Sequence, residues 1–184
     1  FDVLRDGLLQ SVLIADRSGE EYEEVADLTA NATAMFELRR ADVITVLVDG
    51  QRLASSRDRA DVMGAIPLII QGMVENGAFA RKPNLAIVLT KDDAVQASPR
   101  KDHVQRDFLA IINGIRDAFA SHFGEFGSFV TAASPKHSNV ERGAGLAEML
   151  EFWMKPGSVP QGIRLRHSSG RVFDGLMIEE TKRG

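Results

Sequence analysis

Short apolar runs alternate along this chain with longer segments that have the hydrophobic spacing of helices. The apolar runs at residues 10–15, 42–48, 84–89 and 128–132 are predicted to be strands. Strands that are almost continuously apolar are typical of a parallel sheet that is covered on both faces. The alternation therefore predicts an α/β fold in three layers, with a mainly parallel sheet and helices on both faces.

The intervening segments are predicted to be helical because their apolar residues recur every three or four positions. Residues 57–76 form the first long helix, and Pro67 within it predicts a kink or a break. Residues 99–119 form a second helix, which Ser98 is expected to cap. Residues 144–154 form the last helix.

The chain has 184 residues, which is enough for one domain and a short extension. Residues 1–156 carry the alternating pattern and are predicted to be that domain. Residues 157–184 differ, because apolar and polar residues alternate there on either side of a Ser-Ser-Gly turn at 168–170. We expect this segment to be a C-terminal extension that contains a small hairpin.

Composition excludes several classes of function. The net charge of -4 is too small to indicate a nucleic-acid partner. The absence of cysteine excludes disulfides and thiolate metal sites, and it fits a cytoplasmic protein. The histidines show no metal-ligand spacing, and no apolar run approaches the roughly 20 residues of a membrane span.

Polar residues follow the predicted strands directly, at the edge where parallel sheets bind ligands. The run at residues 85–89 leads into Thr90, Lys91, Asp92 and Asp93. One aspartate can accept hydrogen bonds from both N1–H and the 2-amino group of guanine, a donor pair that adenine lacks. A lysine can lay its methylene stem along the base while its ammonium stays in water. We therefore predict that Asp93 and Lys91 recognise guanine and that Thr90 ties neighbouring loops together.

These residues resemble the Asn/Thr-Lys-x-Asp motif of the GTPase superfamily of P-loop proteins. Residues 16–19 (Asp-Arg-Ser-Gly) resemble its Asp-x-x-Gly motif, and residues 129–134 resemble its Ser-Ala-x loop. Each motif follows a predicted strand in the order found in GTPases, and the resemblance covers residues 8–156. The sequences of residues 13–22 and 46–50 are most similar to those of bacterial double-GTPase domains, which occur in large multidomain proteins.

The resemblance assigns phosphate and metal roles near the first motif. It implies that Asp16 holds Mg²⁺ through water and that the backbone N–H of Gly19 meets the terminal phosphate of GTP. Glu20 stands where many GTPases carry a water-orienting glutamine, so it is the candidate catalytic residue. A structural alternative is that Glu20 is an acid in the first turn of a helix. Arg17 is a weaker candidate for a phosphate contact.

The resemblance also implies that backbone N–H groups of the Ser-Ala-x-like loop contact the guanine base. The residues that would provide them are Ala132, Ala133 and Ser134. Lys136 is close enough in sequence to touch the nucleotide. The alternative for this stretch is an ordinary turn of small residues. GTP or GDP and Mg²⁺ are the cofactors that the resemblance implies.

One part of the GTPase pattern is missing from the sequence. No Gly-x-x-x-x-Gly-Lys-Ser/Thr string occurs, and this is the loop whose amides hold the phosphates. In this fold the loop follows the first strand, so it would lie before Phe1. Either the N-terminal phosphate-loop segment lies outside this sequence, or the domain is degenerate. The sequence as it stands is not expected to hydrolyse GTP.

Three functions are therefore compared. The first is a guanine-nucleotide switch, a GTPase-like domain in a larger bacterial protein with protein partners or neighbouring domains. The second is a degenerate pseudo-GTPase that acts as a protein–protein interaction module. The third is a von Willebrand A-like metal-binding domain, in which Asp16 and Ser18 would be ligands. The third requires a serine where Glu20 stands and leaves Lys91 and Asp93 unexplained.

Overall fold

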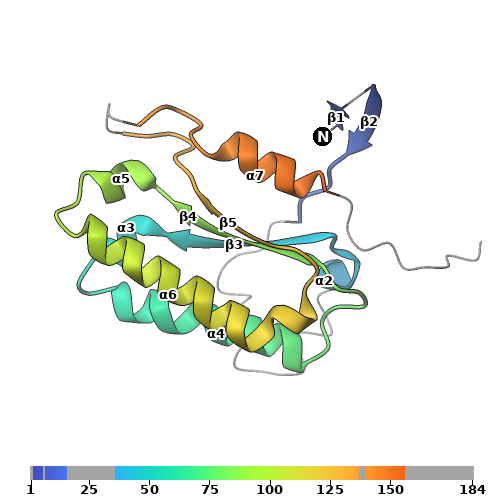
Figure 1. Cartoon of the computed structure of the whole chain (residues 1–184), viewed down its shortest axis with the longest axis horizontal. Helices are drawn as coiled ribbons and strands as arrows, with labels where there is room; N and C mark the ends of the chain where they lie inside the picture. Colours follow the sequence, from blue (N-terminus) through green and yellow to red (C-terminus); the bar gives the residue numbers. More distant parts are fainter. Residues whose placement is uncertain (1, 6, 16–35, 137–139, 156–184) are drawn as a thin grey trace, which may run out of the picture.

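The structure is a computed structural model that describes residues 2–5, 7–15, 36–136 and 140–155 (Figure 1). Its elements, in chain order, are β1 (Asp2–Arg5), β2 (Leu8–Ser11), α2 (Phe36–Arg40), β3 (Val43–Asp49), α3 (Gly50–Ala54), α4 (Arg59–Glu75), β4 (Asn84–Thr90), α5 (Asp92–Gln96), α6 (Lys101–Phe119), the 3-10 turn η2 (Ala120–His122), β5 (Phe126–Val130) and α7 (Leu146–Trp153). Among these helices, none is long and apolar enough to cross a membrane.

The central sheet is parallel, and its strands lie in the order β3-β4-β5. β4 is the middle strand, and all its residues from Asn84 to Leu89 are buried. The register aligns Asp49 of β3 with Thr90 of β4, and Leu89 with Val130 of β5. The carboxyl ends of the three strands therefore lie at one edge of the sheet, where the loops after them meet.

Helices cover both faces of this sheet, as the sequence predicts. Figure 1 shows α4 and α6 on one face and α7 on the other. On the first face, alternate residues of β4 such as Ile87 join Ile70 and Ile115 in the larger core cluster. On the second face, Val88 packs with Phe152 of α7. Alternation along β4 thus supplies apolar side chains to two separate layers.

The first predicted strand is displaced in the structure. The strand is Leu8–Ser11, not residues 10–15, and it pairs antiparallel with β1, which was not predicted. Gly7 forms the connection with a positive φ of 78°, a conformation that glycine adopts without steric cost. The register of this hairpin, with Asp2 opposite Ser11, fixes where the strand ends.

Other boundaries also differ from the prediction. The last strand is Phe126–Val130 and not 128–132, and α6 begins at Lys101, two residues later than predicted. α4 runs without a break through Pro67, so the predicted break does not occur. Packing of α4 against the sheet and α6 outweighs the loss of one helical hydrogen bond. Gly77 follows the C-cap residue Asn76, and its φ of 62° is the left-handed conformation that commonly ends a helix.

Candidate functional site

The end of β4 and the turn after it carry three of the predicted residues, Thr90, Lys91 and Asp93. Oγ1 of Thr90 donates a hydrogen bond to the carbonyl oxygen of Val48 at 3.2 Å, which ties β4 to β3. The chain then turns at Lys91, whose φ of 57° is the only positive value for a non-glycine residue in the described ranges. α5 begins directly afterwards and carries Asp93 in its first turn. The local order of strand, left-handed residue and helix therefore brings Lys91 and Asp93 to the same edge.

Asp93 is a buried carboxylate, with an exposed fraction of 7%. Its Oδ2 accepts a hydrogen bond at 2.9 Å from the backbone N–H of Lys136. The other oxygen, Oδ1, makes no side-chain hydrogen bond within the described ranges. A carboxylate oxygen has room for more than one donor, so Oδ1 can accept hydrogen bonds from a ligand.

Lys91 is held by Asp49, a residue that the sequence analysis did not assign to the site. Its Nζ lies 2.7 Å from Oδ2 of Asp49, the last residue of β3. Oδ1 of Asp49 accepts the backbone N–H groups of Gln51 and Arg52 at 2.9 and 3.1 Å and so caps α3. The signal available in the sequence was an aspartate before a short helix-compatible stretch, which is the position of an N-cap.

The ionisation of Asp49 follows from these contacts. Partial burial by itself would raise the pKa of the Asp49 carboxyl. The hydrogen bond from Lys91, the two backbone donors and the charge of the ammonium outweigh burial and hold the pKa below its ordinary value. Asp49 and Lys91 therefore form a charged pair at neutral pH.

The loop after β5 meets the end of β4 through backbone hydrogen bonds. Thr131 donates its N–H to Leu89 at 2.8 Å, and its carbonyl accepts from Asp92 at 3.1 Å. The N–H of Ala132 is already bonded to the carbonyl of Ala144 at 3.1 Å. Ala133 and Ser134 are exposed, and their N–H groups have no partner within the part of the chain that the structure describes.

Glycines allow two close backbone approaches around this edge. A Cβ at Gly50 would lie 2.5 Å from the carbonyl oxygen of Thr90 and 2.6 Å from a methyl of Val95. A Cβ at Gly145, whose φ is 74°, would collide with the carbonyl oxygen of Val130. Any side chain at either position would push a strand end away from its neighbour.

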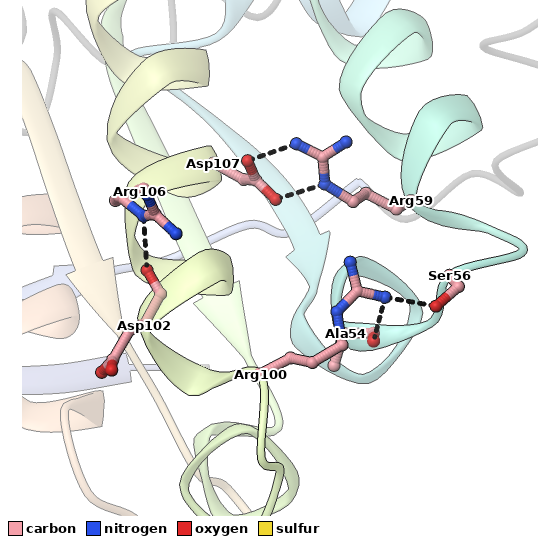
Figure 2. A network of polar contacts seen from close by, with 7 residues as sticks. All are labelled: Ala54, Ser56, Arg59, Arg100, Asp102, Arg106 and Asp107. Carbon is pink, nitrogen blue, oxygen red and sulfur yellow. Dashed lines mark hydrogen bonds and ion pairs between the residues drawn. The ribbon is translucent and has the colours of Figure 1, made fainter.

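Arginine contacts fix the helices behind the site. Figure 2 shows Arg59 and Asp107 facing each other, with two hydrogen bonds of 2.6 Å. Arg100 reaches the α3–α4 loop, where its Nη1 lies 2.5 Å from Oγ of Ser56 and 3.3 Å from the carbonyl oxygen of Ala54. The hydrogen bond from Arg59 holds the pKa of the Asp107 carboxyl below its ordinary value. These contacts join α3, α4 and α6.

The predicted phosphate residues Asp16, Arg17, Gly19 and Glu20 lie outside the described residues, as does the 157–184 extension. Within the described ranges no group of three or more His, Asp or Glu residues could hold a metal ion. A groove of about 320 Å³ between α4 and α6 is lined mainly by apolar residues such as Pro67 and Phe119. That groove does not include the residues at the strand ends.

The sequence was also compared with known proteins. A search of the curated proteins and a search of the solved structures each found no match. A scan of protein families found that the sequence model of Double-GTPase 2 matches residues 1–154. This match supports a GTPase-like domain that binds GTP or GDP. The chain belongs to the Double-GTPase 2 family and is a GTPase-related domain of the double-GTPase type.

Proposed function

We propose that this chain supplies the guanine-recognising side of a molecular switch that binds GTP or GDP with Mg²⁺ in a larger cytoplasmic bacterial protein. The observation that carries the proposal is the carboxylate of Asp93. It is buried at the carboxyl end of the central strand, and its Oδ1 has no partner among the described side chains. A position of this kind selects ligands that bring hydrogen-bond donors.

The contacts proposed for the base follow from the donors and acceptors at this edge. Asp93 accepts N1–H and the 2-amino group of guanine, and the stem of Lys91 lies along the ring. The N–H groups of Ala133 and Ser134, which have no partner among the described residues, donate to O6, because the N–H of Ala132 is bonded to Ala144. Adenine carries an amino group in place of O6. Its N–H donors would face the N–H donors of the loop, so adenine would bind more weakly.

The phosphate side of the site is proposed from residues beyond the described ones. Asp16 would hold Mg²⁺ through water, Gly19 would contact the terminal phosphate, and Glu20 would orient the attacking water. A phosphate-binding loop would arrive on one further strand. β3 offers a place for it, because β3 pairs with β4 alone among the described strands and its Leu47 is 64% exposed.

Calorimetric titration of the full-length protein with GDP, GTP and ADP in the presence of Mg²⁺ tests this proposal. GDP and GTP should bind, ADP should bind much more weakly, and Asp93→Ala should abolish the guanine preference. Asp42→Ala is the matched control, because Asp42 is an exposed aspartate before the opposite end of β3. Equal affinity for ADP would overturn the proposal. A folded protein that binds no guanine nucleotide would instead favour the interaction-module alternative.

A further inference from the structure

We propose that Asp49 is a positioning residue of the guanine site, which it serves by holding the ammonium of Lys91. The inference rests on the proposed function, since it gives Lys91 the role of a support under the base. Asp49 is not a ligand of the base in this proposal. It acts through the 2.7 Å contact between its Oδ2 and Nζ of Lys91.

The register of the sheet creates this contact. Asp49 lies opposite Thr90, so the residue that follows Thr90 comes within reach of the Asp49 side chain. Gly50 brings the two strand ends close together, because its missing side chain leaves room for the carbonyl of Thr90. The pair therefore spans two adjacent strand ends at the edge where the base is proposed to bind.

Asp49 is itself fixed before it contacts the lysine. Its Oδ1 accepts the N–H groups of Gln51 and Arg52 and so holds the carboxylate at the start of α3. Its Oδ2 is then directed at Lys91. The two oxygens have separate partners, so one can be altered chemically while the other keeps its role.

A lysine in this position needs such a support. The side chain of Lys91 is 51% exposed, and an unrestrained stem of four methylenes samples many rotamers. Ordering the stem on binding would reduce the affinity for the base. An ammonium held by Asp49 restricts the stem to conformations that place Nζ beside the end of β3. Asp49 thus preorganises Lys91.

The direction in which GDP affinity changes when Asp49 is neutralised distinguishes a positioning role from a purely electrostatic one. Guanine nucleotides are anions, so removal of a nearby aspartate should strengthen their binding if Asp49 acts only through its charge. If Asp49 positions Lys91, its neutralisation should weaken binding. The two explanations therefore predict opposite changes in affinity.

Asp49→Asn is the informative variant, because asparagine is also a good helix N-cap but does not form the ion pair. We expect it to weaken GDP binding to the full-length protein about two- to fivefold, the range expected of a partly exposed ion pair. In a Lys91→Met background, which keeps an unbranched stem, the same substitution should have no effect. Asp49→Ser, another N-cap, is the second variant if Asp49→Asn does not fold.

Asp42→Asn is the matched control, because Asp42 forms an ion pair of 2.6 Å with Arg81 beside the other end of β3. It should leave GDP affinity unchanged. Unchanged or tighter GDP binding by Asp49→Asn would overturn the inference, as would an equal loss in the Lys91→Met background. If Asp93→Ala abolishes binding while Asp49→Asn does not weaken it, the proposed function stands and the positioning role fails. If the wild-type protein binds no guanine nucleotide, both fail.

Discussion

Asp93 and Lys136 are joined by a hydrogen bond from the backbone N–H of the lysine to Oδ2 of the aspartate, at 2.9 Å. This contact links the first turn of α5 to the loop after β5. It sets the orientation of the carboxylate proposed to read the guanine edge. The side chain of Lys136 takes no part in it, so the importance of position 136 lies in its main chain.

Substitution of Lys136 by proline should therefore weaken GDP binding, whereas substitution by alanine should not. Proline removes the N–H donor, and a lost hydrogen bond to a charged acceptor corresponds to about 1.5–3 kcal/mol. We expect a loss of GDP affinity of about ten- to a hundredfold for Lys136→Pro, measured by calorimetry. An equal loss for Lys136→Ala would show that the lysine side chain matters instead.

Replacement of Asp93 by asparagine should change which base is preferred. Guanine offers two donors to Asp93, and asparagine presents one acceptor and one donor. Xanthine has N1–H next to a C2 carbonyl, so it matches the amide. We expect GDP affinity to fall at least about tenfold, while xanthosine diphosphate binds better than GDP. Competition between the two diphosphates measures this, and an unchanged preference for GDP would contradict the assigned role of Asp93.

Gly50→Ala should destabilise the protein, because the new methyl would collide with the carbonyl oxygen of Thr90 and with Val95. A clash of this kind in packed structure corresponds to about 1–3 kcal/mol of unfolding free energy. Gly64→Ala in α4 is the matched control, because a Cβ at that position would meet nothing within 4 Å. It should stabilise the helix by about 0.5–1 kcal/mol. Urea unfolding compares the two, and equal effects would show that Gly50 is not tightly packed.

The ion pair of Arg59 and Asp107 should make stability depend on acidic pH. The hydrogen bond from Arg59 lowers the pKa of folded Asp107 below its ordinary value of 3.8. A lowered folded-state pKa stabilises the protein above 3.8, and this stabilisation is lost as the pH falls through the folded-state pKa. Asp107→Asn should thus lower the melting temperature near neutral pH. Its difference from wild type should shrink as the pH falls below 3.8, and a difference that persists in acid would contradict the linkage.

The buried strand and the long helices could be predicted because their patterns are local. The segment 84–89 is almost wholly apolar, and the structure extends the strand only to Thr90. Residues such as Phe108 and Ile115 recur at helical spacing and do lie in the core. Burial on a face requires a regular pattern in the sequence, so these elements leave a clear signal.

Other features depend on contacts between distant segments or on very short elements. α5 spans only Asp92–Gln96 and has no room for helical periodicity. The partnership of Asp49 with Lys91 arises from the register of β3 against β4, which no single strand encodes. The uninterrupted α4 reflects tertiary packing around Pro67, which a local rule for proline does not include. The motif residues could be predicted from residue type and spacing. The residues that hydrogen-bond to them, such as Asp49 and Lys136, could be identified only from the structure.

The left-handed backbone of Lys91 implies a compromise between folding and binding at this position. A φ of 57° is a conformation that glycine adopts freely and that a residue with a Cβ adopts at a cost of roughly 1 kcal/mol. Lys91→Gly should therefore raise the melting temperature while it reduces GDP affinity. A lysine here costs the fold more in backbone strain than its partly exposed ion pair with Asp49 returns, and its main use is the proposed contact with the base.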